Sequence, residues 1–382
     1  MRTYLKPEFI LAFYLHVFYY TKFLSLYLPI PSILLVGGAS FGLAFLAFLT
    51  VRTFQRETLL RWLVFLGGVS LVFIGSMLLA PNPFISQSLQ NLILYGIIPL
   101  FILSLVTDVK DLLKGHLFFA FPTGLLLMTE PFRDYYLTGN YMTFGFGLYM
   151  TSATGLAIGY KLTRNRFYLL LYLLELGFIG IWGNKGAFIA GSILLVVLLY
   201  DQFKVWGRLG LISALIVMAL YLKIILLTLI DWLVSLGFSS YSLSTFKQLL
   251  TEDSADVTSL RTDIWEIALQ FGWEHYGGVG VGTFVKLTDI IYPHNVFLDF
   301  WVMFGLWGLI AFIIIFILSL KKALETQNPY LKICRIGALL AWFMPMQFSL
   351  VIWDVQMFWL YFGLVFLLND SPIREEKSIT KL

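Results

Sequence analysis

The sequence Tyr292-Pro293-His294-Asn295 runs directly into Val296-Phe297-Leu298-Asp299 and, further on, into Gly305-Leu306-Trp307-Gly308. It places a histidine and an amide at the start of a strongly apolar helix, because Pro293 fits at or just before a first helical turn, where its missing N–H costs nothing. His294 is then expected among the free N–H groups at the positive end of the helix dipole. That position disfavours imidazolium and leaves a ring that can accept a proton. The same helix end suits a phosphate oxygen.

A purely structural interpretation of this stretch is also open. His294 would then mark a membrane interface, and Gly305 and Gly308 would form a small-xxx-small surface for helix packing. The rest of the chain has to decide between the two.

The composition is that of a membrane protein. Of the 382 residues, 59% are hydrophobic and 13% are charged, against about 45–50% and about 25% in soluble domains. Long apolar runs recur along nearly the whole chain, which predicts an all-α polytopic membrane protein. The net charge of +4 does not indicate a nucleic-acid partner, because most basic residues fall in short loops between spans. The single cysteine, Cys334, excludes an internal disulfide framework, and the first apolar run lacks a cleavage site and is expected to be retained.

Apolar runs of ~17–25 residues predict about twelve transmembrane helices. They lie near residues 8–28, 31–51, 62–80, 90–106, 115–130, 141–160, 167–183, 187–202, 209–230, 293–319, 336–352 and 353–369. The first nine fall within residues 1–230 and the last three within 291–369, and residues 370–382 form a short tail.

Basic residues alternate between the loops on the two sides of the predicted membrane, as the positive-inside rule expects. The side expected to be cytoplasmic, with both termini, carries Arg2, Lys6, Arg52, Arg56, Arg61, Lys110, Lys114, Lys161, Arg164, Arg166, Lys204, Arg208, Lys321, Lys322, Lys332, Arg335, Arg374, Lys377 and Lys381. The other side carries only Arg133, Lys185, Lys247, Arg261 and Lys286. These few outer cations are candidates for function.

Residues 231–290 are too many for a simple turn and predict one large outer loop with helices of its own. Its stretch 251–256 is an acidic turn, and Arg261 to Phe271 is expected to be an amphipathic helix capped by Thr258 or Ser259. The glycine-rich run 277–282 then turns the chain back toward His294. It is not a dinucleotide-binding fingerprint, because no strand–helix unit surrounds it.

Three outer residues besides His294 could carry chemistry. Arg261 begins the amphipathic helix, and Lys185 lies in the tight turn Gly183-Asn184-Lys185-Gly186. Asp299 lies inside a span, where a carboxylate is costly unless it faces a wet or paired site. Asn184 and Asn295 are expected to support the site. The alternative is that both cations are merely solvated.

The remaining polar residues of this side suggest no further site. His275 is expected to be a surface-loop residue, and Lys22 and Lys223 are expected to extend to the membrane interface. No outer Asp-x-Asp or His/Cys cluster indicates a metal site, and no cofactor is expected.

These motifs together resemble those of the bacterial O-antigen polymerase and O-antigen ligase superfamily. His294-Asn295, nine residues, and then Gly305-x-x-Gly308 is similar to the family signature. Arg261-Thr262-Asp263-Ile264-Trp265 and Gly280-Val281-Gly282-Thr283-Phe284 resemble the segment that leads to the family's histidine. Gly183-Asn184-Lys185-Gly186-Ala187 resembles its Ser-Arg-Gly turn, with Lys185 in place of the arginine. The resemblance covers roughly residues 180–310, and the first half agrees only in hydropathy.

The resemblance implies a glycosyltransferase of class C architecture at the outer face of the bacterial cytoplasmic membrane. Its donor would be an oligosaccharide on undecaprenyl diphosphate. The family's roles would make His294 the general base and Arg261 and Lys185 the diphosphate-binding cations, without a metal. This chemistry agrees with the residue types, since cations stabilise a diphosphate leaving group and histidine accepts a hydroxyl proton.

The acceptor decides which enzyme this would be. A second lipid-linked repeat unit would make it a polysaccharide polymerase, which the lack of an extra acceptor-binding domain favours, with a chain-length regulator as a further partner. Lipid A-core as acceptor would make it an O-antigen ligase, and a protein acceptor an O-oligosaccharyltransferase. A lipid-glycan flippase or transporter would instead need charges near the membrane midplane. A membrane scaffold would leave Asp299 and the outer cations unexplained.

Overall fold

The computed structural model of the chain describes residues 6–51, 56–200, 204–251, 261–290, 292–347 and 349–370. Over these residues the fold consists of helices joined by turns and short irregular segments, which confirms the predicted all-α class. The acidic turn predicted at 251–256, apart from Thr251, the predicted cap at Thr258 or Ser259, and the predicted tail after Asp370 lie outside the described residues.

The first half of the chain contains α1 (Pro7–Tyr14), α2 (Val17–Leu24), α3 (Ser32–Thr50), α4 (Arg56–Leu79), α5 (Phe84–Leu92), α6 (Ile98–Ser104), α7 (Val109–Met128), α8 (Tyr141–Gly147), α9 (Thr154–Thr163) and α10 (Arg166–Trp182). The second half contains α11 (Lys185–Tyr200), α12 (Val205–Ser235), α13 (Tyr241–Thr251), α14 (Arg261–Glu274), α15 (Thr283–Thr288), α16 (Val296–Glu325), α17 (Pro329–Phe343) and α18 (Gln356–Phe366). One π-helical stretch joins α5 to α6 and another joins α8 to α9.

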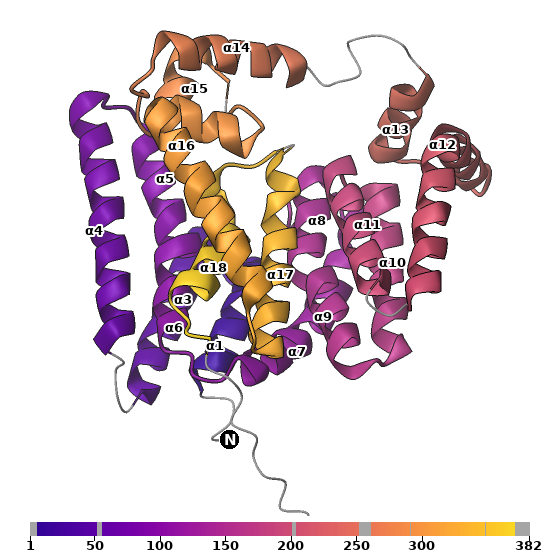
Figure 1. The fold of residues 1–382 in the computed structure, drawn as a ribbon, viewed down its shortest axis with the longest axis horizontal. Coiled ribbons are helices and arrows are strands. Elements are labelled where there is room, and N and C mark those ends of the chain that lie inside the picture. Colours follow the sequence, from indigo (N-terminus) through magenta and orange to yellow (C-terminus); the bar gives the residue numbers. More distant parts are fainter. Residues whose placement is uncertain are drawn as a thin grey trace, which may run out of the picture.

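Five helical stretches are long and apolar enough to cross a membrane. They are Ser32–Thr50, Arg56–Leu79, Phe84–Ser104, Val109–Phe132 and Val296–Glu325. In Figure 1 the helices stand side by side between α4 at one edge and α12 at the other. Helices α14 and α15 lie across one end of this assembly, and the N-terminus lies at the other. Outward-facing apolar side chains on α3, α4 and α16 give the assembly the surface expected of a protein in a lipid bilayer.

Each predicted span overlaps a helix, but two of the predicted stretches, 8–28 and 336–352, are not continuous helices. The stretch 8–28 is broken between α1 and α2, where the chain turns at His16 and the ring of His16 meets that of His116, with Nε2 3.0 Å from Nδ1. Helix α17 ends at Phe343 rather than continuing to residue 352, because Pro345 has no N–H to donate to a helical carbonyl. Two short 3₁₀ turns, Pro345–Gln347 and Ile352–Asp354, then lead into α18.

Arg335 is fully buried in α17, although its sequence context predicts a loop cation. Its Nε donates to the Leu364 carbonyl at 2.9 Å, and its Nη2 donates to the Leu368 carbonyl at 3.0 Å. Its Nη1 donates to the Thr326 hydroxyl at 2.6 Å. The last carbonyls of a helix have no partner within it, so this guanidinium satisfies the end of α18 and ties it to α17.

Helix α16 is bent at Gly305, where the sequence predicts an uninterrupted helix. Gly305 has φ 70° and ψ −173°, and the chain segment Tyr276–Gly280 lies against this break. The backbone N–H groups of Val279 and Gly280 donate to the carbonyls of Val302 and Met303 at 3.0 and 2.9 Å. In the opposite direction, the Leu306 N–H donates to the Tyr276 carbonyl at 2.9 Å. The bend thus leaves backbone N–H and carbonyl groups of α16 without helical partners, and the segment Tyr276–Gly280 forms hydrogen bonds to them.

Glycine is required on both sides of this contact. A Cβ on Gly305 would overlap the Tyr276 carbonyl oxygen, and a Cβ on Gly278 would overlap the Gly305 backbone nitrogen. The backbone conformation of Gly305 is also one that residues with a side chain almost never adopt. Gly305 is therefore a site of backbone docking, not half of a small-xxx-small helix-packing surface. Through this docking, α16 holds the end of α14.

We expect Gly305→Ala to lower the stability of the folded chain. The backbone conformation alone costs a residue with a Cβ about 1–3 kcal/mol, and the clash with Tyr276 adds to this. Gly75→Ala is the matched control, since a Cβ there meets nothing within 4 Å, and alanine in a helix is favoured over glycine by about 1 kcal/mol. Thermal unfolding in detergent measures both. Equal stability of the two variants would contradict the docking role of Gly305.

Candidate functional site

Side chains from four separate segments gather where α14 begins. The charge of Arg261, the first residue of α14, interacts with Lys185 and with the hydroxyls of Tyr141 and Tyr292. The rings of Tyr292 and His294 lie in contact, with their centroids 4.4 Å apart and their planes at 50°. We call these five residues the basic–aromatic cluster. Arg261 lies within electrostatic range of Lys185 and of Tyr292, and Tyr292 in turn contacts His294, so these residues, far apart in the sequence, share one region of the fold.

Burial and a neighbouring like charge act on both cations of the cluster. Burial lowers the pKa of Arg261, while the tyrosine hydroxyls act in the opposite direction. Burial also lowers the pKa of Lys185, and the positive charge of Arg261 lowers it further. The ammonium group of Lys185 lies over the ring of Phe246 in α13, 5.5 Å from its centroid. Two like charges brought together out of bulk water are unfavourable unless an anion offsets them, so this arrangement suits an anionic ligand.

Asn184 fixes the turn that carries Lys185. Its Oδ1 accepts from the Ala187 N–H at 2.7 Å, which caps the start of α11, and its Nδ2 donates to the Met142 carbonyl at 2.7 Å. The Ser242 hydroxyl donates to the neighbouring carbonyl of Gly183. Because both polar ends of its side chain are engaged, Asn184 acts as a positioning residue for Lys185.

His294 directly precedes the N-cap residue of α16, whereas the sequence predicts it among the free N–H groups of the first helical turn. Asn295 is the N-cap of α16, and its Oδ1 accepts from the N–H groups of Phe297 and Leu298 at 2.9 and 3.3 Å. The asparagine therefore satisfies the helix end at which the histidine, or a phosphate oxygen, was expected. His294 itself has φ 56°, a left-handed conformation that is uncommon for a residue with a side chain. Such conformations are concentrated at functional sites.

The irregular segment after α17 forms one wall of the cluster. Asn295 Nδ2 donates to Gln347 Oε1 at 3.3 Å, and the hydroxyls of Tyr292 and Ser349 are 3.0 Å apart. The Ser349 hydroxyl also donates to the Met142 sulfur at 3.4 Å. Sequence reasoning did not assign Tyr141, Gln347 or Ser349 to the site. The signal available for the last two was a pair of polar residues following Pro345 within a predicted span.

Asp299 is buried against the turn Ile352–Asp354. Its carboxylate accepts the backbone N–H of Ile352 and lies near the carboxylate of Asp354, which in turn accepts from Asn91 Nδ2 at 2.6 Å. These contacts anchor the first turns of α16 to the segment before α18. A role for Asp299 in shaping the site stays a prediction.

His275 lies at the end of α14 and is engaged there. Its ring stacks on that of Phe271 with 4.3 Å between centroids, and its Nδ1 is 3.0 Å from the Phe271 carbonyl. Lys22 likewise has a local role, since its ammonium donates to the Leu137 carbonyl at 2.7 Å. Over the described ranges, no three His, Cys, Asp or Glu side chains are grouped so that they could hold a metal ion.

Comparisons with protein-family models, with curated proteins and with solved structures gave no match to this chain. The geometry of the basic–aromatic cluster and the motif resemblance are therefore the two grounds for a functional proposal.

The proximity of the two cations predicts a measurable change at Lys185. Removing the charge in Arg261→Gln takes away one of the two causes that lower the Lys185 pKa, so this pKa should rise toward its usual value. The pH at which the amine becomes reactive should then rise as well. Mass spectrometry of the Lys185 peptide after acylation over a range of pH measures it.

Lys286→Gln is the control, because Lys286 bonds to the Pro81 carbonyl away from the cluster. It should leave the acylation profile of Lys185 unchanged. The same profile in wild type and Arg261→Gln would mean that the two cations do not share a site.

Proposed function

We propose that this chain is a glycosyltransferase that acts at the outer face of the bacterial cytoplasmic membrane on a glycan carried by undecaprenyl diphosphate. The observation that carries the proposal is that the charges of Arg261 and Lys185 influence each other and that Tyr292 lies within range of Arg261 and in contact with His294. Two cations suit a diphosphate, and a histidine beside them suits the deprotonation of a sugar hydroxyl. The resemblance of the motifs to the O-antigen polymerase and ligase superfamily points to the same chemistry.

The topology of the proposal has about twelve spans, both termini in the cytoplasm and residues 231–290 as an outer loop. The five apolar helices and the distribution of basic residues support it. The start of α4, whose second turn contains Arg61, lies at one end of the molecule, and α14 lies at the opposite end (Figure 1). The part of α16 after Gly305 is about 20 residues long, enough to span a bilayer by itself. The cluster would then lie at the outer boundary of the membrane.

In the proposed step, an acceptor hydroxyl gives its proton to His294 while its oxygen forms a bond to the anomeric carbon of the donor sugar. The bond from that carbon to the diphosphate oxygen breaks, and its electron pair leaves with undecaprenyl diphosphate. Arg261 and Lys185 offset the negative charge that develops on this leaving group. Attack opposite the leaving group inverts the configuration of the anomeric carbon.

The acceptor we propose is a second lipid-linked repeat unit, which would make the protein a polysaccharide polymerase. The described part of the outer loop contains the end of α12 and the short helices α13, α14 and α15, so no further domain is seen in its described residues. An O-antigen ligase, with lipid A-core as acceptor, would use the same cluster, as would a protein O-oligosaccharyltransferase.

A carrier for a lipid-linked glycan is the second candidate, because some ionisable groups are buried between helices away from the cluster. The His16–His116 pair is one, and Glu175, which accepts from the Ser152 hydroxyl at 2.6 Å, is another. Proton-coupled carriers use such groups. Glu175→Gln should leave glycan transfer by the purified protein intact if the enzyme proposal is right, and a carrier would show flux without transfer.

Cysteine labelling tests the proposed topology. The one native cysteine, Cys334, is buried, so background labelling should be low. In intact cells, a membrane-impermeant maleimide should label Gln270→Cys in α14 but label Glu57→Cys at the start of α4 only after permeabilisation. Both positions are exposed. The reverse pattern would place the cluster in the cytoplasm and contradict the proposal.

Substitution of His294 tests the catalytic step. His294→Gln should slow transfer by ~10²–10⁴-fold, the usual effect of removing a general base. Donor binding should persist, because Arg261 and Lys185 remain. The assay measures transfer from purified lipid-linked donor. His275→Gln is the matched control and should stay close to wild type, since His275 contacts Phe271 rather than the cluster.

The left-handed backbone conformation of His294 allows its effect on stability to be separated from its role in transfer. His294→Gly should be more stable than His294→Ala by about 1 kcal/mol, because glycine adopts this conformation without strain. Neither variant should transfer glycan. A stable variant of either kind that transfers at the wild-type rate would remove His294 from the mechanism.

A further inference from the structure

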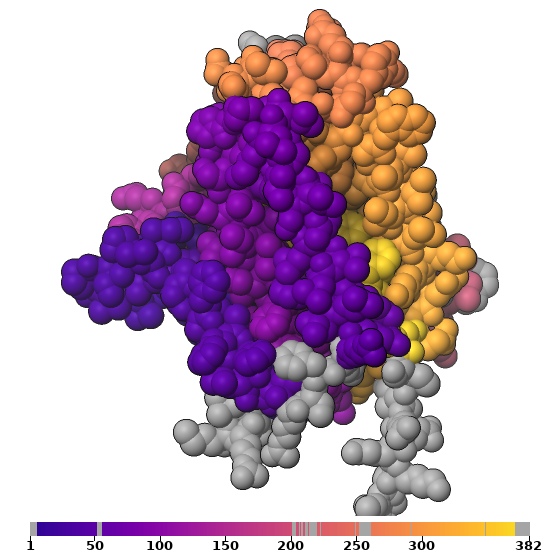
Figure 2. Space-filling model, turned by 90° about the vertical axis from the view of Figure 1, so that its left-hand side faces the viewer, coloured from indigo at the N-terminus to yellow at the C-terminus, as the bar shows by residue number. Residues whose placement is uncertain are grey.

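A groove of about 980 Å³ lies between α4 and α16, away from the basic–aromatic cluster. Figure 2 shows it from the side as a gap between these two helices, with the yellow surface of α18 visible at its bottom. Since α4 and α16 are among the helices long and apolar enough to cross a membrane, the groove would open to the lipid.

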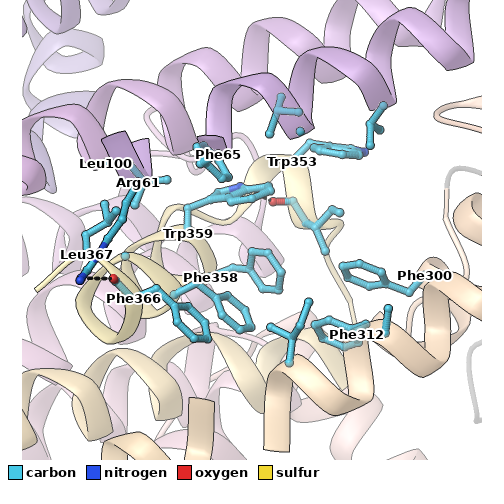
Figure 3. A pocket seen from close by; sticks show the side chains of 18 of the residues that line it. Arg61, Phe65, Leu100, Phe300, Phe312, Trp353, Phe358, Trp359, Phe366 and Leu367 are labelled. Atoms are coloured by element: carbon cyan, nitrogen blue, oxygen red, sulfur yellow. Dashed lines mark hydrogen bonds between the residues drawn. The ribbon is translucent and has the colours of Figure 1, made fainter. Parts of the chain in front are cut away.

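The walls of the groove are almost entirely apolar. Phe300 and Phe312 stack with their centroids 3.9 Å apart on the α16 side, and Phe358 and Trp359 line it from α18 (Figure 3). Phe65 closes the α4 side against Trp359 at 5.8 Å. A long apolar cavity of this kind suits hydrocarbon chains.

The charged residues that line the groove are Arg61 and Lys322, both at its lower end. Arg61 Nη1 donates to the Phe366 carbonyl at 3.1 Å, a bond drawn in Figure 3, and to Asn369 Oδ1 at 3.2 Å. Lys322 lies over the Phe366 ring, 5.7 Å from its centroid. The two cations are near enough for their charges to repel.

Among the described residues, two carboxylates lie near this position, and the charge of Asp370 attracts Lys322. Asp370 accepts the backbone N–H groups of Gln327 and Asn328 at 2.8 and 3.0 Å, so it is directed at the turn before α17. Glu57 approaches Arg61 only to 3.6 Å, and 80% of its side chain is exposed, which makes this a weak surface pair. A guanidinium has five N–H donors, so Arg61 retains capacity for a phosphate.

We propose that the groove binds an anionic glycerophospholipid of the inner leaflet. Its phosphate would lie between Arg61 and Lys322, and its acyl chains would lie along Phe65, Phe300, Phe312 and Trp359. The positive charge of the groove favours an anionic headgroup. Both cations lie near the N-terminal end of α4 and the C-terminal end of α16, on the side of the molecule opposite to α14, which the proposed topology assigns to the inner leaflet. The proposed glycan donor, whose diphosphate would be bound by Lys185 and Arg261, would have its headgroup at the opposite end of the molecule.

Native mass spectrometry of the full chain in detergent tests this site by titration with phosphatidylglycerol or phosphatidylcholine. The wild type should prefer phosphatidylglycerol. Because each basic residue near an anionic lipid contributes about 1 kcal/mol, the double substitution Arg61→Gln/Lys322→Gln should weaken phosphatidylglycerol binding roughly tenfold or more. Lys321→Gln/Lys332→Gln removes the same charge outside the groove and should change binding little.

Two neighbouring glycines of α4 provide a test variant and a control variant for the apolar part of the site. Gly68 lines the groove and Gly67 does not, and a Cβ on either meets nothing within 4 Å. Gly68→Phe should fill the groove and weaken binding of both phospholipids, whereas Gly67→Phe should not.

Three results would overturn the proposal. They are equal affinity for the two headgroups, binding that none of these substitutions in the groove changes, and a polyprenyl lipid as the molecule that copurifies and is lost in Gly68→Phe. The last would assign the groove to the glycan donor. None of them depends on glycan transfer, so the test is separate from that of the proposed function.

Discussion

The backbone contact between Tyr276–Gly280 and the break in α16 at Gly305 is the constraint on which the end of the molecule that carries α14 depends. An apolar helix that loses part of its hydrogen-bond ladder must find other partners, since the membrane supplies none. The segment Tyr276–Gly280 supplies them in three bonds of 2.9–3.0 Å. Because this segment follows α14 directly, the contact also determines where α14 lies, and with it one end of the helix that begins at Arg261.

The basic–aromatic cluster is assembled in the same manner, through backbone and capping bonds. Asn184 holds Lys185 by capping α11, and Asn295 holds His294 in place by capping α16 and reaching Gln347. The two cations are thereby kept close despite their repulsion. Such a site is ready for an anionic ligand before that ligand arrives, which limits the reorganisation needed during a reaction.

The sequence predicts the helical class, which the structure confirms, and it selects Lys185, Arg261 and His294 as candidates, whose shared role stays a prediction. Periodicity and length identify helices well, and the outer cations Lys185 and Arg261 were notable because basic residues are rare on that side. The bend in α16, the position of His294 before its cap and the burial of Arg335 were not predicted. The bend at Gly305 depends on backbone bonds to the segment Tyr276–Gly280, which lies 25 or more residues earlier in the chain. The position of His294 depends on Asn295, which takes the N-cap position of α16. The burial of Arg335 depends on the carbonyls of α18. The contacts of Gly305 and Arg335 are tertiary and have no local signature, whereas the cap at Asn295 is local and was available from the sequence.

The stereochemistry of transfer by the purified wild-type protein tests the central claim most directly. The protein would be incubated with an undecaprenyl-diphosphate-linked oligosaccharide and a second lipid-linked unit in the presence of EDTA, and the anomeric configuration of donor and product would be compared by NMR. The account predicts a new glycosidic bond of inverted configuration. A product of retained configuration, or no transfer by a folded protein offered donors of this class, would contradict it.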